Sequence, residues 1–153
     1  MHKLFPKSMI LVIPLALALT ACIRTVEKPG APDFRAAVEQ HLEAVENRDF
    51  DTFKNTLTKT DDLNVIFPGG SVLENTQAVL DFHKQWFADD KWVFKTNIEK
   101  VIGGSDQSTA LVKYSFQDSA DGEPREAWLV LTFQLEDGSW RLIHDQNTRI
   151  DRE

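Results

Sequence analysis

The chain has 153 residues and a formal net charge of −7, from 24 acidic and 17 basic side chains. This acidic balance argues against a nucleic-acid partner and against electrostatic docking on anionic lipid, since both require clustered positive charge. The single cysteine excludes an internal disulfide. Stability must therefore come from packing, for which ten Phe and four Trp provide large apolar surfaces.

The amino-terminal segment has the pattern of an export signal. Met1–Lys7 is a basic head without an acid, Met9–Leu19 is an apolar run, and Leu19-Thr20-Ala21-Cys22 follows. The run is shorter than the roughly 20 residues that span a bilayer, and small residues before the cut are typical of a cleaved signal peptide. The last four residues resemble the lipobox of bacterial lipoproteins. This resemblance implies a signal peptide of residues 1–21 and lipidation of Cys22.

The lipobox resemblance also implies a location. Two or three acyl chains on Cys22 would anchor the protein stably in a lipid bilayer, whereas one chain binds only marginally. Ile23 follows the cysteine, where an Asp commonly signals inner-membrane retention in Gram-negative bacteria. We therefore expect an outer-membrane protein facing the periplasm; in a Gram-positive host the anchor would lie in the cell membrane. Residues 22–32 are expected to form a tether and residues 33–153 a single domain.

The first half of this domain predicts helices. Apolar residues recur at three- and four-residue steps after Asp33, which is a plausible N-cap, and the pattern ends at Asn47-Arg48-Asp49. A short second helix is expected over 50–57. A third helix, capped by Asn75, should run to about residue 87. Between them, residues 65–67 predict a short strand closed by Pro68-Gly69-Gly70.

From Trp92 onward the apolar period changes to two, which predicts strands. Four long strands are expected, around residues 92–98, 110–116, 127–133 and 140–145. Glu136-Asp137-Gly138-Ser139 predicts a hairpin turn between the last two. Helices followed by an antiparallel meander indicate an α+β domain with the helices packed on one face of the sheet.

Three local patterns occur in an order that resembles a known superfamily. They are Val38-Glu39-Gln40-His41-Leu42 through Asn47-Arg48-Asp49-Phe50, Thr60-Asp61-Asp62 through Phe67-Pro68-Gly69-Gly70, and the run from Trp140 to Thr148. Together they resemble the superfamily of nuclear transport factor 2 (NTF2), which includes ketosteroid isomerase and the SnoaL-like domains. The resemblance implies a cone-shaped fold whose curved sheet encloses an apolar pocket at the wide end.

The resemblance also shows which positions of this chain would carry the catalytic residues of the isomerase branch. The isomerase branch uses a carboxylate before the Pro of the second pattern, a tyrosine on the first helix and a protonated Asp on a later strand. In this chain Phe67 stands at the carboxylate position and His41 at the tyrosine position. The strand position falls near Leu131 or Thr132. A phenyl ring cannot carry a proton, so the chain departs from that mechanism and an enzymatic role is uncertain.

Other side chains remain candidates for the pocket. His41 is either a core histidine with one partner or a polar group that points into the pocket. Tyr114, the only tyrosine, has the same two alternatives. His144 is expected to share a face with Trp140 and Leu142 that could point inward, with a structural hydrogen bond as the alternative to catalysis. Further candidates for the wall are Phe67, Trp86, Trp128 and Asn147.

These observations predict a lipid-anchored protein whose domain binds a small apolar or amphipathic molecule in a non-catalytic, accessory role. One alternative is a small-molecule enzyme (isomerase, dehydratase or hydrolase) that uses His41, Tyr114 or His144. Another is a structural module of an envelope complex. No cofactor or metal is expected, because the histidines are isolated in the sequence. Apolar residues on both faces of the strand at 127–133 predict a covered outer face, and the superfamily resemblance implies a second subunit as the cover.

Overall fold

The computed structural model describes residues 32–150. The predicted signal peptide, Cys22 and the predicted tether up to residue 31 lie outside the described residues, as do residues 151–153.

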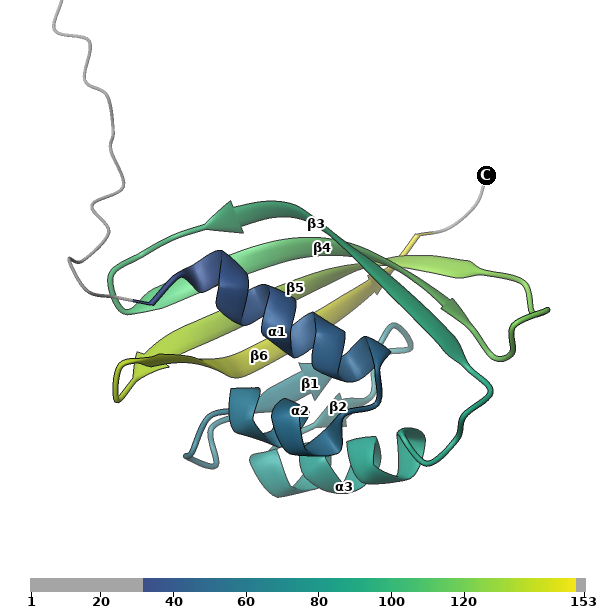
Figure 1. Ribbon diagram of the computed structural model, residues 1–153, viewed down its shortest axis with the longest axis horizontal. Coiled ribbons are helices and arrows are strands. Elements are labelled where there is room, and N and C mark those ends of the chain that lie inside the picture. Colours follow the sequence, from purple (N-terminus) through teal and green to yellow (C-terminus); the bar gives the residue numbers. More distant parts are fainter. Residues whose placement is uncertain (1–31, 151–153) are drawn as a thin grey trace, which may run out of the picture.

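The described chain is an α+β domain in which three helices pack against the concave face of one curved sheet, as predicted (Figure 1). The helices are α1 (Phe34–Glu46), α2 (Phe50–Thr56) and α3 (Thr76–Trp86). The strands are β1 (Asn64–Ile66), β2 (Val72–Leu73), β3 (Val93–Ile102), β4 (Gln107–Gln117), β5 (Arg125–Glu136) and β6 (Ser139–Arg149). Their order across the sheet is β2-β1-β6-β5-β4-β3.

Side-chain caps set where the helices begin. Asp33 accepts a hydrogen bond from the amide of Arg35 at 2.9 Å, Asp49 from that of Thr52 at 3.0 Å, and Asn75 from that of Ala78 at 2.8 Å. Each bond satisfies a backbone N–H that has no partner inside its helix. The predicted caps of α1 and α3 are thus confirmed.

The sheet differs from the predicted meander at its short strands. β1 pairs in parallel with β6, and β2 adds an antiparallel edge beyond β1. The sequence did not indicate β2, because two residues are too few to show a period. The long strands β3 to β6 are antiparallel as expected.

The turn between β5 and β6 has positive φ at Asp137 and Gly138 (47° and 76°), which suits a two-residue hairpin loop.

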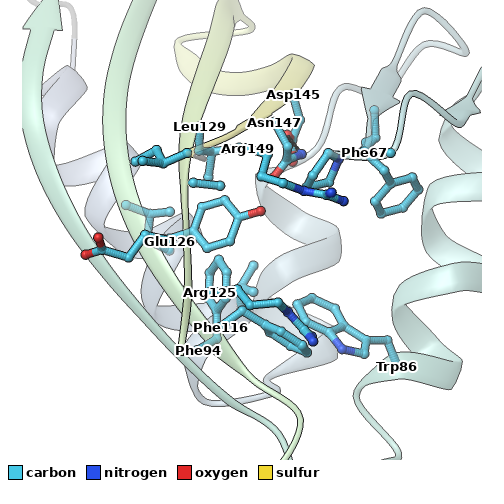
Figure 2. A pocket seen from close by; sticks show the side chains of 18 of the residues that line it. Phe67, Trp86, Phe94, Phe116, Arg125, Glu126, Leu129, Asp145, Asn147 and Arg149 are labelled. Carbon is cyan, nitrogen blue, oxygen red and sulfur yellow. Dashed lines mark hydrogen bonds between the residues drawn. The ribbon is translucent and has the colours of Figure 1, made fainter. Parts of the chain in front are cut away.

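An extra residue in β6 changes which side chains face the helices. Leu142 pairs with Phe133 and His144 pairs with Thr132, so Ile143 has no partner in β5 and forms a bulge. Before the bulge the even-numbered residues of β6 point inward, and after it the odd-numbered ones do. The expectation that His144 shares a face with Trp140 and Leu142 is therefore wrong, and Asp145 faces inward in its place. Figure 2 shows Asp145 beside Asn147 within the same space.

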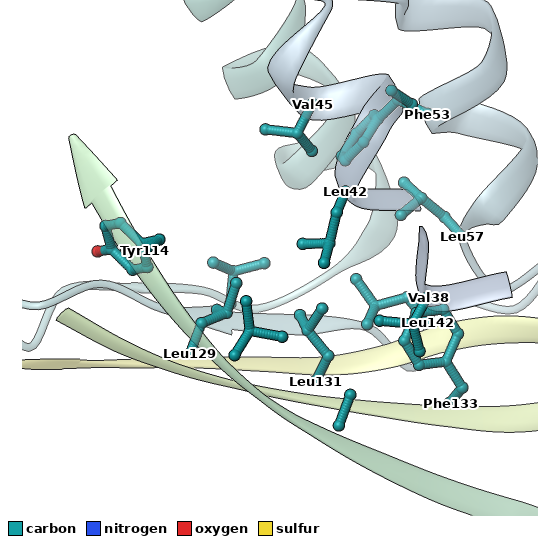
Figure 3. Packing of buried hydrophobic residues seen from close by; sticks show 14 of the residues in the cluster. Val38, Leu42, Val45, Phe53, Leu57, Tyr114, Leu129, Leu131, Phe133 and Leu142 are labelled. Carbon is teal, nitrogen blue, oxygen red and sulfur yellow. The ribbon is translucent and has the colours of Figure 1, made fainter. Parts of the chain in front are cut away.

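The core lies between the helices and the inner faces of β4, β5 and β6. Side chains from α1 and α2 meet those of the sheet there (Figure 3). The largest fully buried ones are Phe53, Phe133, Leu63, Leu131, Leu142, Val38, Val79 and Val112. Some core residues, among them Leu42, Val45 and Leu129, also line a cavity.

Candidate ligand-binding cavity

A cavity of about 800 Å³ opens between the helices and the inner face of the sheet. Its wall combines residues from α1, α3, the segment after β1 and strands β3 to β6. Much of this wall is aromatic. The rings are contributed by Phe67, Phe82, Trp86, Phe94, Tyr114 and Phe116. A cavity of this size with mostly apolar walls and a few polar groups is typical of small-molecule sites.

A second layer holds the aromatic wall in place. The ring of Trp92 stacks on that of Trp86 with centroids 4.4 Å apart, and its Nε1 donates to the Trp86 carbonyl oxygen at 2.8 Å. The guanidinium of Arg48 lies 3.6 Å from the centroid of the Trp92 ring, a cation–π contact. Arg48 also donates to the carbonyl oxygens of Asp89 and Trp92, which ties the end of α1 to this segment.

Polar groups gather on one side of the cavity. Asp145, Asn147 and Arg149 occupy three successive inward positions of β6 after the bulge. Tyr114 joins them from β4. It lies in register with Ala127 of β5, which is in turn in register with Arg149. Because alanine is small, the two longer side chains can approach each other above it.

Hydrogen bonds fix the orientation of Asn147 and Asp145. The Asn147 Nδ2 donates to the Ile66 carbonyl oxygen at 2.9 Å and to Asp145 Oδ1 at 2.8 Å. A carbonyl oxygen only accepts, so the amide nitrogen must face it. When Asp145 is protonated, its proton therefore lies on Oδ2, the oxygen that does not accept from Asn147.

Burial sets the protonation of this cluster. Burial raises the pKa of Asp145 to about 7, against which the hydrogen bond from Asn147 acts only in part. Burial and the charge of Asp145 raise the pKa of Tyr114 to about 12. Below neutral pH both groups are therefore neutral and can donate a hydrogen bond.

Two buried histidines line the inner part of the wall. His41 Nδ1 lies 2.7 Å from the hydroxyl of Thr56, whose own proton goes to the Phe53 carbonyl oxygen. His83 Nδ1 lies 2.8 Å from the Val79 carbonyl oxygen. Both acceptors require a proton on Nδ1, so each Nε2 carries a lone pair. Burial lowers the pKa of His41 to about 3 and that of His83 to about 4, so both rings are neutral.

The predicted site residues divide into two groups. The structure places His41, Phe67, Trp86, Tyr114 and Asn147 in the cavity wall. His41 was expected to be either a core histidine with one partner or a polar group in the pocket. It is both, since it is buried and hydrogen-bonded and also part of the cavity wall.

Trp128 and His144 do not line the cavity, and their assignment to it is wrong. Trp128 points to the outer face of β5, because Ala127 and Leu129 on either side of it are the buried inner residues. His144 is turned outward by the bulge, where its Nδ1 forms a hydrogen bond with Asn64 of β1. Cys22 lies outside the described residues.

Sequence reasoning did not place Asp145, His83 or Arg149 in the cavity, although all three line it. Nothing in the local pattern of β6 indicated the bulge, since a bulge depends on the pairing with β5. His83 had a usable signal, because it follows the apolar Val79 by four residues and so lies on the same face of the expected helix.

Residues 32–150 hold no group of three or more side chains that could bind a metal ion. Among the helices of this region, none combines the length and the apolar character needed to cross a membrane.

Comparisons with known proteins agree with the fold. The family model of the SnoaL-like domain matches residues 34–147, so this chain belongs to the SnoaL-like family. No curated protein matches the sequence.

Solved structures share the fold at low sequence identity. A Thiobacillus denitrificans protein, proposed as a calcium/calmodulin-dependent protein kinase type II association domain, has a TM-score of 0.69 at 19% identity, covering 78% of this chain and 97% of its own. A proposed NTF2-like dehydratase from Streptomyces avermitilis has a TM-score of 0.68 at 15% identity, covering 77% and 94%. A Mycobacterium tuberculosis LEH-like epoxide hydrolase has a TM-score of 0.59 at 20% identity, covering 75% and 76%. At these identities the likeness shows the fold alone.

The raised pKa of Asp145 predicts a specific pH dependence of stability. An unfolded Asp titrates near 3.8, so the folded chain holds an extra proton between about pH 4 and 7 and loses that stabilisation as the pH rises. Relative to Asp145→Asn, the free energy of unfolding of the wild type should fall by about 2 kcal/mol from pH 5 to pH 8. Urea unfolding of both chains measures this difference. If the difference in free energy of unfolding between the wild type and Asp145→Asn were the same at pH 5 and pH 8, the carboxyl of Asp145 would be exposed to water and not buried.

Proposed function

We propose that this protein binds a small, mainly apolar molecule that carries a hydrogen-bonding group. The observation that carries the proposal is the cavity itself, with its aromatic wall and a polar cluster confined to one side. An apolar body buried there would leave water at a gain of about 25 cal/mol per Å². Tyr114 and Asp145 would orient its polar group, both as neutral donors below about pH 7 and with Asp145 as an ionised acceptor above it.

Phe67 offers a test of this proposal. Phe67→Asp places a charge in the apolar wall, and burying an unpaired charge is costly. At pH 8 the variant should bind 2-naphthylmethanol about tenfold or more weakly than the wild type, while Phe67→Leu, which keeps the wall apolar, should change the affinity about threefold or less. Isothermal titration calorimetry measures both. Equal affinities for the Asp and Leu variants would mean that the probe does not enter this cavity.

A second candidate function is acid–base catalysis in the same cavity. It is favoured by Asp145, whose pKa of about 7 suits a group that gives and takes a proton near neutral pH. Some proteins of similar fold carry enzyme names, among them the dehydratase and epoxide hydrolase described above. The two functions differ in the fate of the ligand, which a binding protein releases unchanged and an enzyme converts.

We also propose that Cys22 anchors the protein by lipid, at the periplasmic face of the outer membrane in a Gram-negative host. The support is the sequence alone: the basic head, the apolar run and the Leu19-Thr20-Ala21-Cys22 pattern. The binding domain would then work at the cell envelope, with the membrane as its location and not as its ligand.

The anchor is tested by Cys22→Ser. The serine cannot be lipidated on sulfur, so the variant should remain an uncleaved or mis-sorted precursor with no lipid mass. Membrane fractionation and intact-mass measurement on cells that express the full chain report this. A variant that stays in the membrane at the processed mass of the wild type, apart from the sulfur-to-oxygen change, would rule out the lipobox.

We further propose a homodimer through the outer face of the sheet. Leu111, Trp128 and Val130 are adjacent on this face, since Leu111 pairs with Val130 and Trp128 is two residues away on the same strand. All three are only partly buried in the single chain. A second copy would cover this apolar area, which a lone sheet would expose to water.

The dimer predicts that Val130→Glu yields monomers, because the interface would bury a charge without a partner. Val72→Glu is the matched control, since Val72 is 46% exposed on β2 at the far edge of the sheet. This control should stay dimeric. Sedimentation velocity distinguishes the species, and a wild type that is monomeric at tens of micromolar would contradict the dimer.

A further inference from the structure

The cavity lining holds two arginines whose charges differ in their surroundings. Arg125 donates two hydrogen bonds of 2.8 Å to the carboxylate of Asp118, so its charge is paired. The side chain of Arg149 makes no hydrogen bond or ion pair with any residue between 32 and 150. The neighbouring carboxylate of Glu126 is already bound to Lys113 at 2.9 Å. Arg149 therefore keeps a guanidinium available to a ligand.

The surroundings of Arg149 favour a bound anion. Figure 2 shows Arg149 beside Asn147 and Asp145, with Phe67 nearby across the cavity. Tyr114 and Arg149 flank the small Ala127 in one row across β4, β5 and β6, and the charge of Arg149 acts on the phenol. Burial keeps Asp145 protonated below about pH 7, so that it donates a hydrogen bond and adds no negative charge. This side of the cavity thus offers one cation and two neutral donors.

We propose that the ligand is an apolar carboxylic acid, held by its carboxylate on Arg149 and the Tyr114 hydroxyl, with its body against the aromatic wall. This assignment rests on the proposed binding function. A guanidinium matches a planar carboxylate through two parallel hydrogen bonds. A single unpaired cation suits a singly charged group better than a phosphate dianion, which would need further positive charge.

The test compares two probes of the same shape at pH 6, 2-naphthoate and 2-naphthylmethanol, by isothermal titration calorimetry. The wild type should bind the carboxylate more tightly than the alcohol. Arg149→Gln should weaken naphthoate about tenfold and the alcohol by no more than about twofold, because only the carboxylate uses the charge. Arg125→Gln is the matched control, because it also removes an arginine from the cavity wall, but one whose charge Asp118 already neutralises. This variant should change naphthoate binding about twofold or less.

The outcomes separate this inference from the function on which it rests. Failure of both probes to bind at millimolar concentration would overturn the proposed binding function, and the carboxylate assignment with it. Binding of both probes, with Arg149→Gln weakening them equally or Arg125→Gln weakening naphthoate as much, would overturn the carboxylate assignment alone. The cavity would then remain a site for neutral molecules.

Discussion

The bulge at Ile143 is the constraint on which the site depends. It interrupts the pairing of β6 with β5 between Leu142 and His144 and reverses the inward face of the strand beyond it. Through this reversal a carboxyl, an amide and a guanidinium enter a cavity whose other walls are mainly aromatic. An unbroken strand would instead direct His144 and the even-numbered residues after it inward. Bulges also increase local twist, which helps the sheet to curve around the helices.

Burial then decides the charges inside the cavity. His41 and His83 stay neutral because the folded chain surrounds them, and both use Nδ1 as a donor to helical partners. Below about pH 7 the carboxyl of Asp145 is also neutral. With the proposed function, such a site would recognise a ligand mainly by its apolar shape and by a few directed hydrogen bonds, and Arg149 would supply the charge selectivity.

The parts of the fold set by local chemistry were predictable from the sequence. Asp33 and Asn75 accept from amides two or three residues onward, so the helix starts follow from the capping residues themselves. The turn at Asp137 and Gly138 likewise follows from residues that tolerate positive φ. The wall positions of His41 and Phe67 came from the family resemblance, which covers most of the domain. Asp145 could not be predicted, because its direction depends on a pairing irregularity between two strands.

The central claim is that the bulge directs Asp145 into a ligand cavity, and its carboxyl signal tests this most directly. A ¹³C NMR titration of the Asp145 side chain, repeated with 2-naphthylmethanol, reports both its environment and its access to ligand. We expect a titration midpoint near 7, and a change in the signal when the alcohol binds. A midpoint near the ordinary Asp value of about 4, unaffected by the alcohol, would contradict it.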